Sequence, residues 1–220
     1  LPHASLAFET IDSELLFDQK ISDGDQVSPG TIIASVSGLA RSILSAERTA
    51  LNFMCHLSGI STLTAQFVAQ IAHTDARMCC TRKTIPGLRA SQKYAVRRGG
   101  GSNHRFGLDD AILIKDNHIA VVGGITKALE AAKAFAGHLV KIEIEVDTLD
   151  QLEEALIAGA DCVLLDNFSA DRLREAVEIN RGRAALEASG DVKLETVKAI
   201  AESGVDYISS SQITMSATTF

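Results

Sequence analysis

The sequence predicts an α/β protein: an incomplete (β/α) TIM-like barrel preceded by part of a small α/β sandwich domain. From Ala76 onward, short apolar strand-like segments alternate with helical segments, an order typical of a parallel sheet with right-handed crossovers. Polar residues follow the ends of several successive strands, where a barrel presents its reactive groups. A doubly wound dinucleotide-binding sheet is disfavoured, because no Gly-x-Gly-x-x-Gly stands at a strand-to-helix junction.

The N-terminal part, residues 1–50, is assigned to the partial sandwich-like domain and the start of a linker helix. Up to about Gly38 the pattern is short and β-like, and segments 17–21 and 31–36 flank turn residues as in a hairpin. Apolar residues at helical intervals then predict a long helix over about 42–73, interrupted near Ser58-Gly59. The chain begins at Leu1 and not at a methionine, so we expect an N-terminal segment to precede it.

Residues 51–220 are assigned to the barrel, which we expect to be the catalytic domain. Its predicted strands span 76–82, 111–115, 141–146, 161–165, 184–188 and 206–210, and its predicted helices span 125–136, 148–158, 169–180 and 193–203. Thr148 and Gln151 have the spacing of a capping box, and Gly159 and Gly204 stand where helices would end.

Composition indicates a cytoplasmic protein with no membrane partner. Hydrophobic residues make up 46% of the 220 residues, yet no apolar run approaches the roughly 20 residues needed to span a bilayer. No signal peptide is recognisable. The four cysteines show no Cys-x-x-Cys pair and no histidine at zinc spacing, so we expect them to be reduced residues of the core or of strands.

Basic residues concentrate between Thr81 and His118, where eight Lys or Arg stand with only three acids. This window carries a net charge of +5 in a chain of −7, so the remainder carries −12. A positive pocket on an acidic body favours a small polyanionic ligand, because the rest of the surface repels a long polyanion. Nucleic acid is therefore excluded as an expected partner.

Several residue pairs in and after this window could bind anions or a metal ion. Arg82-Lys83 and His104-Arg105 are candidate anion clamps, although such doublets are also common as solvated surface pairs. Lys115 ends an apolar strand and is expected to point into the barrel mouth.

Carboxylates and glycines complete the candidate chemistry. Glu145 and Asp166 could hold Mg²⁺, accept ribose hydroxyls or offset positive charge at a sugar carbon, or they could only neutralise the basic cluster. Residues 99–101, three glycines, could cradle phosphate, but a mobile loop is the preferred interpretation. Ser189-Gly190 is expected to precede a helix and to offer backbone N–H groups to a phosphate.

Three ordered motifs resemble the quinolinate phosphoribosyltransferase family, also called nicotinate-nucleotide pyrophosphorylase (carboxylating). They are Thr81 to Arg89 (TRKTIPGLR), Gly99 to Leu108 (GGGSNHRFGL) and Lys115 to His118 (KDNH). The likeness runs from about Asp23 to Met215 and includes ERTALN from Glu47 and LEASG from Leu186.

The resemblance implies that quinolinate and phosphoribosyl pyrophosphate (PRPP) give nicotinate mononucleotide, pyrophosphate and CO₂, with Mg²⁺, in NAD biosynthesis. It also implies a homodimer whose sites lie between one subunit's barrel and its partner's N-terminal domain. Arg48 would then reach the site across the interface.

The resemblance also implies a division of roles among the site residues. Those matching the positions that hold the quinolinate carboxylates are Arg82, His104, Arg105 and Lys115. Those around the ribose and pyrophosphate, expected to be catalytic, are Lys83, Glu145 and Asp166, with Mg²⁺ held mainly by PRPP together with Glu145 and Asp166. The remaining expected substrate contacts, largely to phosphate, are Thr81, Ser189, Gly190, Asp191, Ser209 and Ser211.

Two of these residues depart from the family's pattern, and two other functions stay open. Ser211 stands where a glycine is usual and narrows the space for a phosphate, while Asp191 brings a negative charge near that phosphate.

One alternative function is a barrel aldolase with a Schiff-base lysine at Lys83, Lys115 or Lys141. Another is a non-catalytic relative that only binds an anion, which the intact pairs Arg82-Lys83 and His104-Arg105 disfavour.

Overall fold

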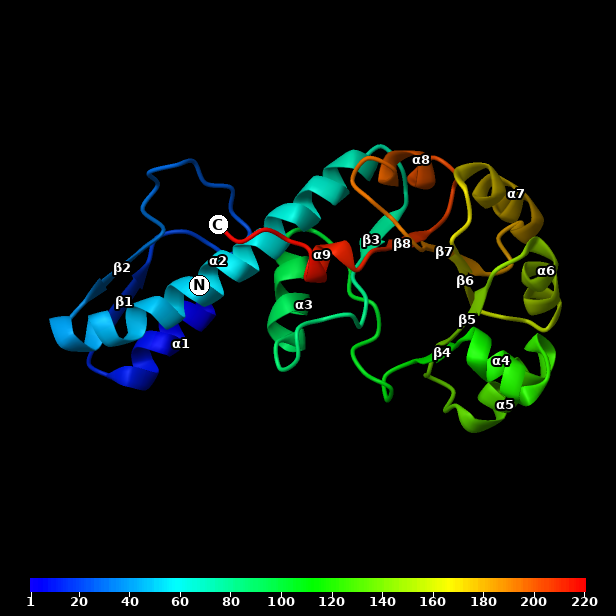
Figure 1. Ribbon diagram of the computed structural model, residues 1–220, viewed down its shortest axis with the longest axis horizontal. Helices are drawn as coiled ribbons and strands as arrows, with labels where there is room; N and C mark the ends of the chain where they lie inside the picture. Colours follow the sequence, from blue (N-terminus) through cyan, green and yellow to red (C-terminus); the bar gives the residue numbers. More distant parts are fainter.

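Helix α2 (Ala40–Ile71) runs through both parts of the computed structural model, which describes residues 1–220 (Figure 1). Its first half packs in an N-terminal lobe and its second half lies against the barrel. The predicted interruption near Ser58-Gly59 is wrong, because the helix continues without a break. Gly59 instead provides space, since a side chain there would collide with the backbone of Thr218 in the C-terminal tail.

The N-terminal lobe contains a helix that the sequence analysis missed. Helix α1 (Pro2–Ile11) occupies part of the region expected to be β-like, and Ala4 and Phe8, one helical turn apart, bury their side chains against α2. The expected hairpin is confirmed: β1 (Leu16–Gln19) pairs antiparallel with β2 (Ala34–Ser37). This lobe has a small core of its own.

The second lobe is an open barrel of six parallel strands, which confirms the predicted fold class. The order across the sheet is β3-β8-β7-β6-β5-β4, so the first two strands of this sheet, β3 and β4, lie at its opposite edges. The strands, each within the predicted segments or shifted by one residue, are β3 (Arg77–Cys79), β4 (Ile112–Ile114), β5 (Ile142–Val146), β6 (Cys162–Asp166), β7 (Ala185–Ser189) and β8 (Tyr207–Ser209).

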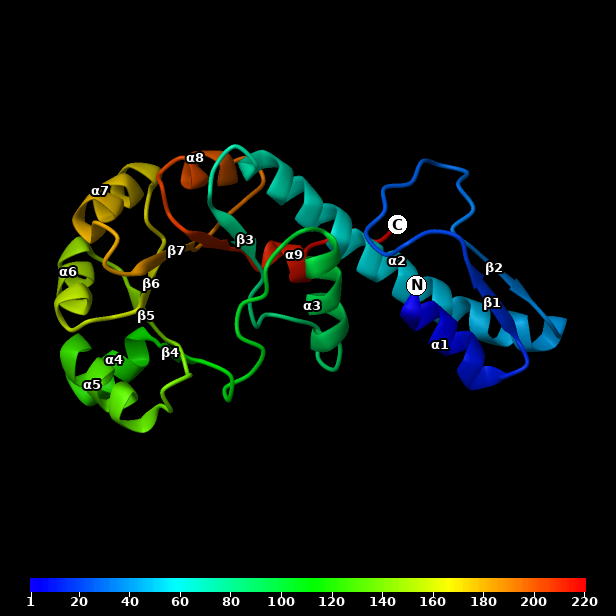
Figure 2. The same ribbon diagram turned by 180° about the vertical axis from the view of Figure 1, so that it is seen from behind.

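Helices cover the outer face of the sheet in an arc that both views show (Figures 1 and 2). Three match their predicted segments closely: α5 (Ile125–Phe135), α6 (Leu149–Ile157) and α7 (Ala170–Asn180). α8 (Val197–Ala201) is shorter than predicted, and two short helices were not predicted: α4 (Asp116–Val122) and α9 (Gln212–Met215). α3 (Arg89–Arg98) carries basic residues of the window identified above. None of the helices combines the length and apolar character that crossing a bilayer requires.

Helix ends follow the predicted signals. The Thr148 hydroxyl accepts the Gln151 backbone N–H at the start of α6, while the Gln151 side chain accepts the N–H of Asp147 in place of a reciprocal bond to Thr148. Gly159 and Gly204 end α6 and the α8 region in the left-handed conformation that glycine adopts without strain.

The alternation of side chains along the strands separates an apolar layer from a polar one. Ile142, Ile144 and Val146 of β5 face the helices and belong to the main hydrophobic core of 31 buried residues. Glu143 and Glu145, which alternate with them, face the other side of the sheet. The barrel interior is therefore partly polar, and the apolar core lies between sheet and helices.

Two of the three glycines at 99–101, Gly99 and Gly101, pack closely against helix α2, where the sequence analysis preferred a mobile loop to a phosphate cradle. A side chain on Gly99 would meet the carbonyl of Ser61 on α2, and one on Gly101 would meet Thr64 of the same helix. Gly99 has φ −80°, so its backbone suits any residue and only the close approach of α2 requires glycine.

Candidate functional site

The carboxyl ends of the strands surround a polar pocket of about 410 Å³. Its lining contains eight of the residues selected from the sequence, and Val192 is its single hydrophobic residue. Those eight are Thr81, Lys83, Asp166, Ser189, Gly190, Asp191, Ser209 and Ser211. They come from the ends of β3, β6, β7 and β8. These four strands lie side by side in the sheet, although β3 is far from the other three in sequence.

The pocket offers hydrogen-bond donors, but not the helix terminus that we expected after Ser189-Gly190. The next helix, α8, begins only at Val197, so its positive end does not reach this loop. Gly190 and Asp191 instead adopt consecutive positive φ angles of 94° and 44°, which turn the backbone sharply at the strand end. Lys193 pairs with Asp191 at 2.8 Å and offsets the negative charge that this loop brings to the pocket.

Four further residues line this pocket without having been selected as site residues. They are Asn167, Val192, Ser210 and Gln212. The position of Asn167 directly after strand-end Asp166 was a usable signal, whereas Gln212 belongs to α9, which the sequence pattern did not reveal.

Lys115 and Glu145 form an ion pair beside this pocket. Glu145 lies at the end of β5 with 12% of its side chain exposed, and Lys115 follows β4 with 47% exposed. Burial raises the pKa of the nearby Asp166 carboxyl, and the carboxylates of Glu145 and Asp147 raise it further. Lys115 and Lys83 oppose that shift, so acids and bases here lie close enough to influence one another.

Arg82 and Arg105 each have a buried hydrogen-bond donor that no protein group accepts. The Nε atom of each guanidinium is buried and has no partner. Arg105 donates through Nη1 to the carbonyl of Ala111 at 3.2 Å, and the pKa of Arg105 is lowered by burial and by the positive charge of Arg82. Two neighbouring guanidiniums with free buried donors form a site that an anion would complete.

Arg89 braces the loops that carry these arginines. Its guanidinium donates to the carbonyls of Arg82 and Phe106 at 3.2 and 3.0 Å, and its Nε donates to the Thr84 hydroxyl at 3.1 Å. The Thr214 hydroxyl also donates to the carbonyl of Lys83 at 2.6 Å. The loops around residues 82 and 105 are therefore held in fixed relative positions.

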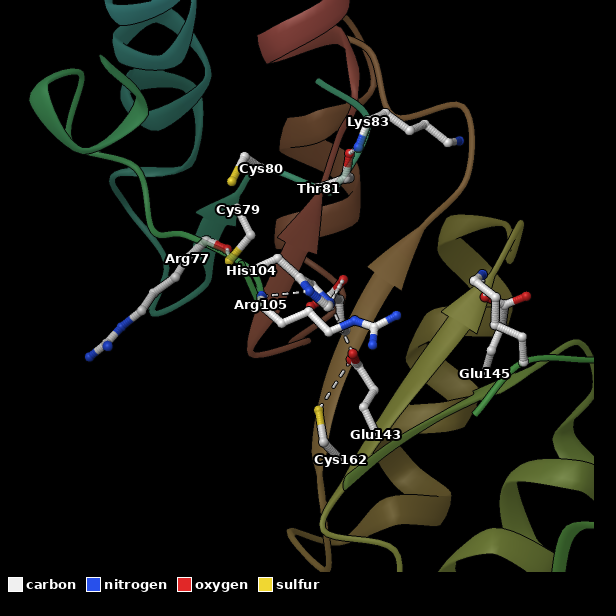
Figure 3. A network of polar contacts seen from close by, with 12 residues as sticks. Arg77, Cys79, Cys80, Thr81, Lys83, His104, Arg105, Glu143, Glu145 and Cys162 are labelled. Atoms are coloured by element: carbon white, nitrogen blue, oxygen red, sulfur yellow. Dashed lines mark hydrogen bonds and ion pairs between the residues drawn. The ribbon is translucent and has the colours of Figure 1, made fainter. Parts of the chain in front are cut away.

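His104 lies inside the barrel (Figure 3), whereas the sequence analysis expected it to bind an anion together with Arg105. Its Nε2 is 2.9 Å from the Glu143 carboxylate, and its Nδ1 accepts the backbone N–H of Arg105 at 2.8 Å. Both ring nitrogens are thus occupied by protein groups. Glu143 and the nearby Glu187 were missed, although the alternation Ile142-Glu143-Ile144-Glu145 already places Glu143 on the same face as the selected Glu145.

Arg48 is the one selected residue that lies far from this pocket. It is exposed on the part of α2 that packs in the N-terminal lobe, whereas the pocket lies in the barrel. Within a single chain the structure does not bring Arg48 to the other selected residues.

The fold and the site define a (β/α)-barrel protein with a polar pocket at the carboxyl ends of its strands, where barrel enzymes carry their active sites. Family models for the N- and C-terminal domains of quinolinate phosphoribosyl transferase match residues 2–58 and 60–220. The chain belongs to the quinolinate phosphoribosyl transferase family.

Relatives and solved structures agree with this assignment. A probable nicotinate-nucleotide pyrophosphorylase (carboxylating) of Bacillus subtilis is 48% identical over 187 residues, which cover 85% of this chain and 65% of the relative. The nicotinate-nucleotide pyrophosphorylase of Mycobacterium leprae is 46% identical over 200 residues, covering 90% and 70%. The crystal structure of NadC from Streptococcus pyogenes superposes with a TM-score of 0.96 at 41% identity, covering all of this chain and 78% of that one. The chain thus spans about two thirds of the length of the curated relatives it matches.

Proposed function

We propose that this protein transfers the phosphoribosyl group of PRPP to quinolinate and releases pyrophosphate, CO₂ and nicotinate mononucleotide, a step of NAD biosynthesis. The observation that carries the proposal is the pair of buried, unpartnered Nε donors on Arg82 and Arg105 beside a polar pocket. Relatives that are named for this reaction, at 41–48% identity, support it.

The arginine pair suits the two carboxylates of quinolinate. A guanidinium binds a planar carboxylate through two parallel N–H donors, and both arginines have donors free. Bringing two such cations together in a partly buried place is unfavourable without an anion, and burial together with the charge of Arg82 lowers the pKa of Arg105. A dicarboxylate would offset both charges and satisfy both buried Nε atoms.

The neighbouring pocket suits the phosphates and ribose of PRPP. Hydroxyl groups of Thr81, Ser189, Ser209 and Ser211 line it, together with the ammonium of Lys83. These are donors for phosphate oxygens, while Asp166 can accept ribose hydroxyls. The Ser211 side chain occupies space in this pocket but contributes a hydroxyl in exchange.

Glu145 and Asp166 fit a magnesium ion bound together with PRPP. Burial and the negative charge of Glu145 raise the pKa of Asp166, and a divalent cation would relieve the repulsion that Asp166 experiences. When bound, Mg²⁺ would neutralise charge on the pyrophosphate. Because Mg²⁺ retains several water and phosphate ligands, two carboxylates are sufficient protein ligands.

The side chains would accelerate the reaction chiefly by positioning and charge. Arg82 and Arg105 would hold the quinolinate ring so that its nitrogen faces the ribose C1, and Lys83 would stabilise the departing pyrophosphate. Asp166 would offset positive charge that develops on the sugar. Once the ring nitrogen carries the ribose it is cationic and acts as an electron sink, so the adjacent carboxylate can leave as CO₂ without a Schiff base.

A homodimer with Arg48 supplied across the interface is the assembly that we propose. Arg48 is exposed on α2 in the N-terminal lobe, and apolar side chains near it are exposed too, such as Leu44 at 71% and Leu39 at 66%. A second subunit covering this face would bury those side chains and bring a third guanidinium to a barrel mouth. The buried free cysteines Cys79 and Cys80 suit a reducing compartment, and we propose the cytoplasm.

The direct test incubates the purified full-length protein with quinolinate, PRPP and Mg²⁺ and measures nicotinate mononucleotide by chromatography, with CO₂ from labelled quinolinate as a second readout. We expect both products in equal amounts, and none when nicotinate replaces quinolinate, because nicotinate lacks the second carboxylate. Absence of product from a dimeric sample would refute the proposed function. Trapping of a substrate adduct on a lysine by borohydride would favour the aldolase alternative.

A further inference from the structure

Three ionisable side chains meet inside the barrel, below the arginine pair. His104 Nε2 lies 2.9 Å from Glu143 Oε2 and 3.6 Å from Glu187 Oε1. Glu143 is 8% exposed and Glu187 is 4% exposed, so two carboxylates are removed from water in a space that also receives one imidazole. Burying two acids is costly, so a position of this kind calls for a specific role.

The carboxylates are held by few other groups. The Cys162 thiol donates to Glu143 Oε1 at 3.4 Å, a weak hydrogen bond that Figure 3 shows. Glu187 Oε1 is buried without any hydrogen-bond partner and faces His104 at 3.6 Å. His104 faces both carboxylates, while the Ser209 hydroxyl also contacts Glu187, and Glu143 lies close enough to Arg105 for their charges to attract.

The tautomer of His104 follows from its partners. Nδ1 accepts the backbone N–H of Arg105, so Nδ1 carries no proton, and the ring proton sits on Nε2 and is donated to Glu143. The peptide carbonyl of His104 accepts from the buried ammonium of Lys93 at 2.7 Å. The residue is thus fixed at both ring nitrogens and at its backbone.

Arg105 comes directly after this fixed point. Its backbone N–H is bound to the His104 ring, and its side chain leaves from there toward Arg82, where its Nε stays free. A rotation of the imidazole would release the Arg105 N–H and allow the start of that side chain to move. Precise placement matters at such a site, because a shift of about 1 Å in a binding group can cost about 100-fold in rate.

We propose that Glu143 and Glu187 are positioning residues which act through the His104 ring to hold Arg105 in the orientation that receives a substrate carboxylate. The proposal rests on the proposed function for its substrate. Neither glutamate lines the pocket itself, although Glu187 contacts the hydroxyl of Ser209, which does. The same three side chains could instead gather around a metal ion, since their ligand atoms lie within 4.8 Å of one another. His104 Nε2 is already engaged by Glu143, so we assign the cluster a positioning role and not a metal site.

The kinetic test compares Glu143→Leu with Glu143→Gln in the full-length protein. Glu143→Leu removes the acceptor for His104, and we expect KM for quinolinate to rise about 10- to 100-fold, the equivalent of one charged hydrogen bond, with KM for PRPP unchanged. Glu143→Gln keeps an amide oxygen for His104, and the Cys162 sulfur can accept from its NH₂, so KM for quinolinate should stay within about threefold of wild type. Glu178→Gln, an exposed glutamate on α7, is the matched control.

A second measurement does not depend on activity. Nitrogen-15 NMR of the histidine rings should show His104 protonated at Nε2 and unprotonated at Nδ1 in the wild type and in Glu143→Gln. Glu143→Leu should shift this pattern toward the other tautomer or a mixture. An inactive wild type would refute the proposed function, while the NMR result would still test the hydrogen-bonded His104.

Three results would overturn the positioning role. One is an unchanged KM for quinolinate in a folded Glu143→Leu, and another is an equal rise in KM for both substrates, which a general structural defect would cause. The third is one equivalent of metal in the purified protein that is lost in His104→Gln.

Discussion

Glu187→Gln should change how the stability of the protein depends on pH. Burial raises the pKa of Glu187 from 4.5 to about 7, and the neighbouring Glu143 carboxylate contributes in the same direction. His104 and the Ser209 hydroxyl oppose the shift without cancelling it. The folded state therefore favours the protonated, neutral form of this carboxyl.

The direction and size of the pH effect on the free energy of unfolding follow from how strongly the folded and the unfolded chain bind this proton. Below pH 4.5 the carboxyl is protonated in both the folded and the unfolded chain, so it contributes no pH dependence. Between pH 4.5 and about 7 the unfolded chain loses the proton while the folded chain keeps it, so the free energy of unfolding falls as pH rises. The full difference amounts to about 3 kcal/mol, since a tenfold change in proton affinity corresponds to about 1.4 kcal/mol.

Glutamine has nearly the same shape as glutamate but does not ionise, so the Glu187→Gln variant should not lose this part of its free energy of unfolding as the pH rises. We expect the free energy of unfolding of Glu187→Gln, measured relative to wild type, to rise by about 3 kcal/mol between pH 4.5 and pH 8. Urea denaturation at several pH values, with Glu178→Gln as the exposed control, measures it. A relative stability that stays within about 0.5 kcal/mol across this range would refute the reasoning, and a fall would mean that His104 holds Glu187 ionised.

Three further predictions concern packing, catalysis and helix capping. Gly99→Ala should lower the free energy of unfolding by about 1–3 kcal/mol, because the added methyl group meets the α2 backbone. Gly137→Ala, which has open space around the added methyl group, should change the free energy of unfolding by less than about 0.5 kcal/mol. Equal thermal-unfolding midpoints for the two variants would contradict this prediction. Arg105→Ala should mainly raise KM for quinolinate and Lys83→Ala should mainly lower kcat, and steady-state kinetics showing the reverse would disprove the division of roles. Thr148→Ala should cost about 1 kcal/mol in denaturant unfolding through loss of the α6 cap, and no loss would mean that water replaces the hydroxyl.

The alternation of apolar segments predicted the six barrel strands because each strand's outward residues form a buried layer. Ile142, Ile144 and Val146 illustrate the pattern, which is local and therefore readable from sequence. Helix α1 was missed because only two of its side chains, Ala4 and Phe8, are buried, and their partners lie on α2. A helix that depends on so few distant contacts leaves a weak local signal.

Part of the candidate site was likewise predictable from the sequence, and part was not. Asp166 and Ser189 end strands and Lys83 lies in the loop after β3, and strand order alone brings their positions to one edge of the barrel. The links among His104, Glu143 and Glu187 depend on the stagger of neighbouring strands, which sequence does not report. The ligand contacts expected of these residues remain predictions, and the Arg48 contribution needs a second chain.

Helix α2 has a consequence for how the molecule folds. At 32 residues it is about 48 Å long, and it supplies Ala46 and Ala50 to the small core and Ile60 and Phe67 to the large one. The boundary between the two matched family domains, at residues 58 and 60, falls inside this unbroken helix. The N-terminal lobe has only five buried core residues and depends on a helix that is anchored in the barrel, so a cut at the family boundary would divide the helix that both cores share.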